Sequence, residues 1–195
     1  MKSNLLRPWI ADIGCGADPI PFANILVDNN VGDTDQRTGE LRTDGKIFYR
    51  ADIMDLPFDD GELDFIYCNH VLEHLDRPDK ALDELQRVSA KGMIGLPAMR
   101  SEAVALYYQP KKPPVHKWLS WRNDSELNML SYNCADRQSA IRALMTLGEW
   151  PPNARGQWEE IRMGWGWGSW PAQLTVRLWQ LRSWQYSDGG GREVQ

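Results

Sequence analysis

The hydrophobic residues in the first half of the chain form short runs that are separated by glycine, proline and acidic residues. Short runs rich in Ile, Val, Phe and Tyr, bounded in this way, are typical of buried β-strands. Predicted strands cover residues 9–13, 24–28, 47–52, 63–69 and 93–97.

One stretch between the fourth and fifth predicted strands has the spacing of a helix instead. Leu82, Leu85 and Val88 fall three residues apart and so share one face, and Pro78 suits a first helical turn. We therefore predict a helix over about residues 78–89. Strands that follow one another through loops and a helix favour a mostly parallel sheet, so the pattern predicts an α/β fold.

The second half of the chain is less regular, and its pattern predicts an antiparallel addition to the sheet. Segments 116–121 and 126–132 flank a polar turn and predict a hairpin. Helical spacing over residues 135–148 predicts a second helix. The last alternating segments, 158–167 and 173–181, predict a closing antiparallel pair.

A glycine turn, ADIGCGADP, follows the first predicted strand. Gly14 and Gly16 leave backbone N–H groups accessible and let a ligand approach without a Cβ in the way. Asp28 and Asp52 end the second and third strands, and the carboxyl ends of parallel strands meet at one sheet edge. A carboxylate there can accept hydrogen bonds from both hydroxyls of a ribose. The pattern favours a Rossmann-like site for a nucleoside-containing cofactor, with a plain tight turn as the alternative.

The turn departs from the dinucleotide-binding fingerprint at Pro19, where that fingerprint has its third glycine. Only residues 17–23 separate Gly16 from the second strand, and they include two prolines. At a rise of 1.5 Å per residue this segment allows about two helical turns at most. We therefore expect some of the helices that would cover the sheet to be reduced or missing.

A longer signature follows the third strand. Its parts are Asp52, Leu56-Pro57-Phe58, Asp60, Asp64 and, after a further strand, Val71-Leu72-Glu73-His74. Together with ADIGCG, it resembles the class I S-adenosylmethionine-dependent methyltransferases, and among them the small-molecule group called methyltransferase type 11. The resemblance covers about residues 9–98. Residues 14–23 and 116–118 resemble a narrower subset of this family, which has the segments GCGxxPxPxA and His-x-Trp.

The resemblance implies S-adenosylmethionine as the cofactor and assigns a part of it to each of eight residues. They are Asp12, Gly14 and Gly16 for the methionine end, Asp28 for the ribose, Asp52 and Ile53 for the adenine, and Asn69 and His70 beside the sulfonium. The Leu56-Pro57-Phe58 segment is expected to pack under the site rather than to touch the cofactor.

The chain has three histidines, and a base for methyl transfer to a hydroxyl acceptor would be sought among them. His116 lies after the fifth strand, where acceptor pockets form in the family, and is one catalytic candidate. His70 is the other, with lining the pocket as its alternative role. His74 begins a helix in the family, so we expect a structural role for it. Glu73, Asp60 and Asp64 have plain structural explanations, the last two at the turn before the fourth strand, and we assign none of them a catalytic part.

The composition of the chain speaks against some classes of binding partner but says little about the reaction. The chain is 42% hydrophobic and 25% charged, as globular domains are, and its net charge of −5 speaks against nucleic-acid binding. The three cysteines are widely spaced and form no cluster with histidine, so the sequence predicts no metal site. No segment approaches the roughly 20 apolar residues of a membrane-spanning helix, and the expected location is cytoplasmic.

Tryptophan is unusually frequent, with ten residues in the chain, and it concentrates near the C-terminal end. Trp165 and Trp167 fall on one face of a predicted strand, with glycines opposite. We interpret them as core or sheet-covering residues. The alternatives are a flat acceptor platform and, because arginines are interleaved, a surface that stacks on single-stranded nucleic acid.

These patterns predict a single domain over residues 1–186, with a cofactor-binding half (9–98), an acceptor half (99–186) and a disordered tail (187–195). The predicted function is transfer of a methyl group from S-adenosylmethionine to a small-molecule or sugar-like acceptor. A non-catalytic binding module that keeps the fold is the first alternative. An NAD-dependent oxidoreductase is the second, and Pro19 speaks against it.

Overall fold

The computed structural model of the chain describes residues 8–32, 39–108, 116–123, 126–131, 137–147, 160–166, 171, 173–180, 184–185 and 192–193. The chain divides into two compact units, each described by itself. The first unit consists of Met1–Val71, Lys80–Ile94 and Met163–Leu174, and the second of Leu72–Asp79, Gly95–Arg162 and Thr175–Gln195. The single domain over residues 1–186 stays a prediction.

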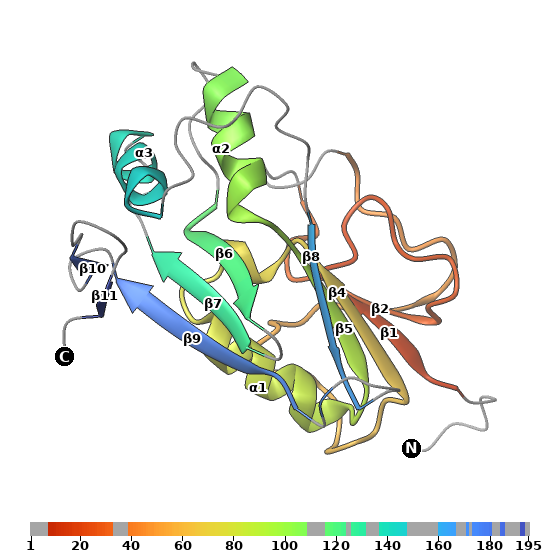
Figure 1. Ribbon diagram of the computed structural model, residues 1–195. Helices are drawn as coiled ribbons and strands as arrows, with labels where there is room; N and C mark the ends of the chain where they lie inside the picture. Colours follow the sequence, from red (N-terminus) through yellow and green to blue (C-terminus); the bar gives the residue numbers. More distant parts are fainter. Residues whose placement is uncertain are drawn as a thin grey trace. The chain divides into compact units, whose positions relative to one another are not determined.

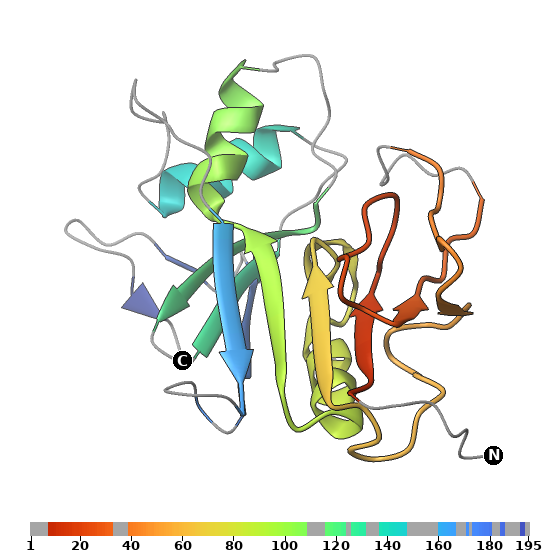
Figure 2. The same ribbon diagram turned by 90° about the vertical axis from the view of Figure 1, so that its right-hand side faces the viewer.

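A mostly parallel six-stranded sheet contains the five strands predicted in the first half of the chain. The strands are β1 (Ile10–Ile13), β2 (Ile25–Val27), β3 (Ile47–Tyr49), β4 (Phe65–Asn69), β5 (Gly92–Pro97) and β8 (Glu160–Trp165). Their order in the sheet is β3-β2-β1-β4-β5-β8 (Figure 1). β1 pairs in parallel with β2 and β4, and β2 pairs in parallel with β3. Figure 2 shows β8 running opposite to β5 at the edge of the sheet.

The predicted helix is confirmed as α1 (Pro78–Val88). Its apolar face is buried, with Leu82, Leu85 and Val88 each at most 1% exposed.

Arg87, on the same helix, donates hydrogen bonds to Glu84, to Asp60 and to the carbonyl oxygens of Phe58 (2.9 Å) and Leu56 (3.3 Å). The Leu56-Pro57-Phe58 segment is therefore held against α1 by one side chain, and Asp60 has a structural role.

Turns replace helices after β1 and β2, as predicted. In the described residues from 14 to 46, the chain forms turns and bends and no helix. Leu26 is fully buried by the turn residues Cys15 and Ala23, with Ile20 and Phe48 packed against the same cluster. This loop cluster covers the sheet where a helix would otherwise lie.

The described residues of the second unit include a three-stranded sheet, helices α2 and α3, and a short 3-10 helix. Its elements are η1 (Leu72–His74), α2 (Met99–Tyr108), β6 (Trp118–Asn123), β7 (Glu126–Ser131), α3 (Arg137–Thr146) and β9 (Thr175–Gln180). β6 and β7 form the predicted antiparallel hairpin, with Leu119 opposite Leu130, and β9 pairs in parallel with β7. Leu119 and Leu130 pack on Ala103 and Leu106 of α2 and on Leu144 of α3.

The predicted antiparallel pairing of segments 158–167 and 173–181 is wrong. β8 lies in the six-stranded sheet, and β9 lies in the three-stranded sheet. Alternation marks a segment as a strand but does not specify its partner. β8 is fixed instead by Trp165, whose indole N–H donates to the Ser89 carbonyl (3.0 Å) and whose ring would come within 2.2 Å of a Cβ at Gly92.

Trp165 is 1% exposed, which confirms the interpretation of this residue as part of the core. Trp167 lies outside the described residues. Helix α2 was not predicted, because its buried face includes the polar residues Ser101 and Glu102. Most of the predicted tail, 187–195, also lies outside the described residues, and within it β11 (Arg192–Glu193) pairs with β10 (Trp184–Gln185).

Candidate functional site

The glycine turn after β1 has the backbone conformation that its sequence requires. Gly14 and Gly16 have φ angles of +74° and +54°, in the left-handed region that favours glycine. The Gly14 N–H donates to the Val27 carbonyl at 2.7 Å, which fixes the turn on the end of β2. A Cβ on Gly14 would lie 2.3 Å from Cγ2 of Val71, so only glycine fits here.

Asp28 lies directly beside this turn. Its Oδ2 accepts a hydrogen bond from the Gly16 N–H (3.0 Å), and its Oδ1 accepts one from the Asn30 N–H (2.8 Å). The carboxylate thus orders the glycine turn, and each oxygen has a further lone pair for a ligand hydroxyl. The structure brings Gly14, Gly16 and Asp28 together as the sequence predicted.

Asp52 and Ile53 follow β3 at the same sheet edge. The Asp28 N–H donates to the Tyr49 carbonyl (3.2 Å), so β2 and β3 end side by side. Asp52 is exposed and its Oδ1 accepts from the Met54 N–H (2.9 Å), whereas Ile53 is only 7% exposed.

The Leu56-Pro57-Phe58 segment follows Asp52 and carries two buried side chains. Leu56 is 3% exposed and Phe58 is 7% exposed. The Phe58 ring packs edge to face on Tyr49, with ring centroids 5.1 Å apart. The expected packing role of this segment agrees with that burial.

Asn69 and His70 follow at the end of β4. The Asn69 Oδ1 is buried and has no hydrogen-bond partner among the described residues, so an acceptor is available there for a ligand donor. His70 has a φ of +55°, an uncommon conformation for a side chain that is not glycine. Such strain is found at ligand sites, where the surrounding structure holds it in place.

Asp12, on β1, is the buried acid of the site. It is 4% exposed, and its Oδ2 accepts a hydrogen bond from the Ile20 N–H (2.8 Å). Burial raises the pKa of Asp12 from 3.8 to about 6, against the opposing effects of the Ile20 hydrogen bond and the Lys46 charge. A cationic ligand group nearby would favour its ionised form.

The residues of this edge fit a nucleoside-containing cofactor. Their described features are a glycine turn that a Cβ would fill, an acid held across it and an unpartnered buried amide oxygen. All eight predicted cofactor residues belong to the first unit.

His116, in contrast, belongs to the second unit. Its Nδ1 lies 2.5 Å from Oε1 of Glu102, a carboxylate that is 5% exposed. Sequence reasoning missed Glu102, because a single acid in an unpredicted helix carries no signal of its partner. The catalytic role of His116 stays a prediction, and so does that of His70.

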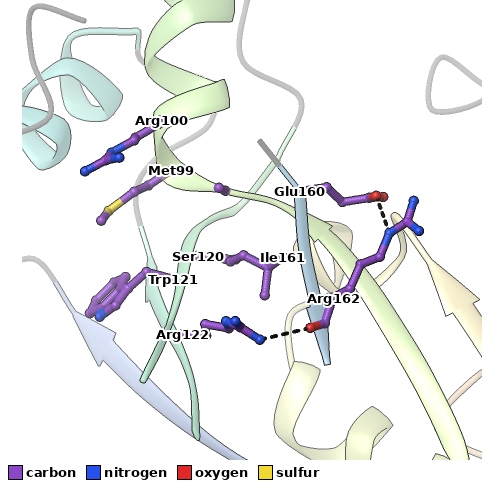
Figure 3. A pocket seen from close by; sticks show the side chains of 9 residues that line it. Met99, Arg100, Ser120, Trp121, Arg122, Glu160, Ile161 and Arg162 are labelled. Carbon is purple, nitrogen blue, oxygen red and sulfur yellow. Dashed lines mark hydrogen bonds and ion pairs between the residues drawn. The ribbon is translucent and has the colours of Figure 1, made fainter. Parts of the chain in front are cut away.

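A cavity of about 490 Å³ lies in the second unit, lined from the start of α2, from β6 and from β8 (Figure 3). The Ser120 Oγ is buried and has no hydrogen-bond partner among the described residues. Trp121 and Arg122 follow it on β6, and Arg122 donates to the Arg162 carbonyl (3.4 Å). The cavity thus offers an aromatic ring, a hydroxyl and guanidinium groups to a small polar ligand.

No helix among the described residues is long and apolar enough to cross a membrane.

One family of known proteins matches the first half of the chain in part. Residues 11–94 match the model of a family described as methyltransferase domain. This match covers less than half of the chain, and over these residues the chain is similar to that family. No curated protein matches the chain at the significance required.

Several solved structures are similar to part of the chain. One is a SAM-dependent methyltransferase from Thermotoga maritima, described as a possible histamine N-methyltransferase, with a TM-score of 0.44 and 20% identity over 57% of this chain and 55% of that chain. The YcgJ protein from Bacillus subtilis has a TM-score of 0.37 and 20% identity over 51% and 53%. A SAM-dependent methyltransferase from Methanosarcina mazei has a TM-score of 0.38 and 16% identity over 62% and 69%. The chain spans about half the length of the first two.

Proposed function

We propose that the chain transfers a methyl group from S-adenosylmethionine to a small-molecule or sugar-like acceptor. The observation that carries this proposal is the glycine turn at Gly14 and Gly16. The Gly16 N–H of this turn donates a hydrogen bond to the Asp28 Oδ2 at 3.0 Å. The family match over residues 11–94 supports methyl transfer as the reaction class.

Each predicted residue has a part in holding the cofactor. Asp28 would accept from the ribose hydroxyls, and Asp52 from the adenine amino group beside the backbone of Ile53. The backbone of the glycine turn would lie against the methionine end of the cofactor. The carboxylate of Asp12 would help to bind the amino group of that end. Bound there, the cofactor supplies an electrophilic methyl group on a sulfonium.

Asn69 and His70 would lie on the sulfonium side of the same edge. The unpartnered Asn69 Oδ1 would accept a hydrogen bond from the ligand. His70 would orient the reacting groups or take the proton of a hydroxyl acceptor. His116 is the other proposed base, and the Glu102 carboxylate at its Nδ1 supports a defined tautomer for it.

A small acceptor is supported by the cavity of about 490 Å³ in the second unit. Sites for small molecules usually have volumes of roughly 300–1,000 Å³ and a few placed polar groups. The lining of this cavity includes the Ser120 hydroxyl and the Arg122 guanidinium, which can form hydrogen bonds with the O–H groups of a sugar-like molecule.

Calorimetric titration with S-adenosylhomocysteine, the demethylated product, tests the cofactor site. We expect binding by the wild-type chain, and an affinity at least about tenfold lower for Asp28→Asn, because a hydrogen bond to a charged group contributes roughly 1.5–3 kcal/mol. Asp83→Asn, which removes an exposed acid from α1, is the matched control and should bind as the wild type does.

The two alternatives give different results in the same titration. A chain that releases no heat and shows no thermal shift with S-adenosylhomocysteine is a non-catalytic module. A chain that is stabilised by NAD but not by S-adenosylmethionine or its product is an oxidoreductase. Either result would overturn the proposed methyl transfer.

A further inference from the structure

Three side chains that commonly bind metal ions meet in the second unit. Glu73 and His74 belong to η1, and His116 lies just before β6. One possible ligand atom from each lies within 4.8 Å of the other two. The rings of His74 and His116 are packed edge to face, with centroids 4.8 Å apart.

The two segments that carry these side chains are joined by two hydrogen bonds. The Lys117 N–H donates to the Glu73 carbonyl at 2.8 Å, and the Trp118 indole N–H donates to the Leu75 carbonyl at 2.7 Å. Trp118 is itself 8% exposed. The cluster is therefore formed by the packed structure and does not depend on an exposed loop tip.

Glu102 selects the tautomer of His116 that can bind a metal ion. Its Oε1 lies 2.5 Å from the His116 Nδ1, and a carboxylate only accepts hydrogen bonds, so Nδ1 carries the proton. The lone pair of His116 is then on Nε2. A carboxylate behind the imidazole is the usual arrangement around metal-binding histidines, where it orients the ring and makes it more basic.

The charge of the cluster also favours a cation. Glu73 is 0% exposed and Glu102 is 5% exposed, so two carboxylates are buried next to two imidazoles. Buried carboxylates are stabilised by a positive charge, and a divalent ion supplies two.

We propose that Glu73, His74 and His116 bind a divalent transition-metal ion, with Glu102 as the positioning residue behind His116. Two histidines and one glutamate, with a fourth position open, form a donor set that zinc accepts. Ligand atoms around tetrahedral zinc are about 3.4 Å apart, so small side-chain rotations bring the three donors into range.

This site gives His116 a role different from that of a base. Its Nε2 lone pair is either donated to the metal ion or available for a proton, so the two roles are alternatives. The metal site does not depend on the proposed methyl transfer, because all four of its residues belong to the second unit and the cofactor residues to the first.

Titration of the chelator-treated chain with Zn²⁺ tests the site. We expect one Zn²⁺ per chain, an affinity at least about 100-fold lower in His116→Ala and Glu73→Gln, and one about 10–100-fold lower in Glu102→Gln. Asp76→Asn is the matched control, because Asp76 is a nearby acid whose side chain is 85% exposed, and it should bind Zn²⁺ as the wild type does. Cobalt(II) in place of zinc should give visible d–d absorption without a thiolate band.

Several results would overturn the proposal. They are the absence of Zn²⁺ binding, binding that is unchanged in His116→Ala, or a cobalt–thiolate band that places the metal on cysteine. Because Glu73 is fully buried and its variant could unfold, His116→Ala decides the matter, with circular dichroism as the check on folding. S-adenosylhomocysteine binding should persist in His116→Ala, so failure of the metal site and failure of the cofactor site are distinguishable.

Discussion

Replacing Gly14 by alanine is expected to destabilise the chain by roughly 2–4 kcal/mol and to abolish measurable binding of S-adenosylhomocysteine. The φ of +74° penalises any side chain, and the new Cβ would lie 2.3 Å from Cγ2 of Val71. Either the turn or Val71 must move, and the turn carries the backbone that faces the proposed cofactor. Urea unfolding and calorimetric titration measure the two effects.

Gly45→Ala separates the steric clash from the backbone penalty. Gly45 has almost the same φ, +75°, but a Cβ there would meet no atom within 4 Å. We expect this control to lose roughly 1–2 kcal/mol and to bind S-adenosylhomocysteine as the wild type does. In the Gly14→Ala background, Val71→Ala removes the clashing methyl group and should restore part of the stability. Equal effects of the two glycine substitutions, or no recovery with Val71→Ala, would contradict this account of the turn.

Replacing Asp12 by asparagine is expected to stabilise the chain at neutral pH and not at acidic pH. The pKa of Asp12 is raised from 3.8 to about 6 in the folded chain, mainly by burial. The folded state therefore binds this proton more tightly than the unfolded state does. The contribution of Asp12 to stability is fully present below about pH 4 and is lost as the pH rises through about 6.

The size of the Asp12 effect follows from the same pKa. Each tenfold change in proton affinity corresponds to about 1.4 kcal/mol, so the wild type should lose up to about 3 kcal/mol relative to Asp12→Asn between pH 4 and pH 8. Asparagine keeps an oxygen for the Ile20 N–H, which makes it the matched substitution. Urea unfolding of both proteins across this range gives the difference, and a difference that does not change with pH would contradict the buried acid.

Asp12 also links pH to cofactor binding. The amino group of the cofactor is a cation and favours ionised Asp12, so affinity for S-adenosylhomocysteine should rise between pH 5 and pH 7 in the wild type. Asp12→Asn should bind more weakly at pH 7 and show a flatter pH profile.

The parts of the fold that could be predicted from the sequence depend on local patterns. The apolar runs define β1 to β5, and the spacing of Leu82, Leu85 and Val88 defines α1. The meeting of Gly16 and Asp28 could also be predicted, because a turn after one parallel strand and an acid after the next reach the same sheet edge.

The parts that could not be predicted depend on contacts between distant segments. The partner of β8 is set by the fit of Trp165 on Gly92, which alternation does not encode. The pairing of Glu102 with His116 joins a helix without a clear apolar stripe to the residue before β6. The cluster of Glu73, His74 and His116 brings together ligands more than 40 residues apart in the sequence, without any short metal-binding spacing.

A crystal structure of the chain grown with S-adenosylhomocysteine tests the cofactor site most directly. We expect the ribose hydroxyls on Asp28, the adenine beside Asp52 and Ile53, and the amino acid part along Gly14 and Gly16. Ligand density at a different place, or side chains that fill the space above the glycine turn, would contradict the proposed methyl transfer.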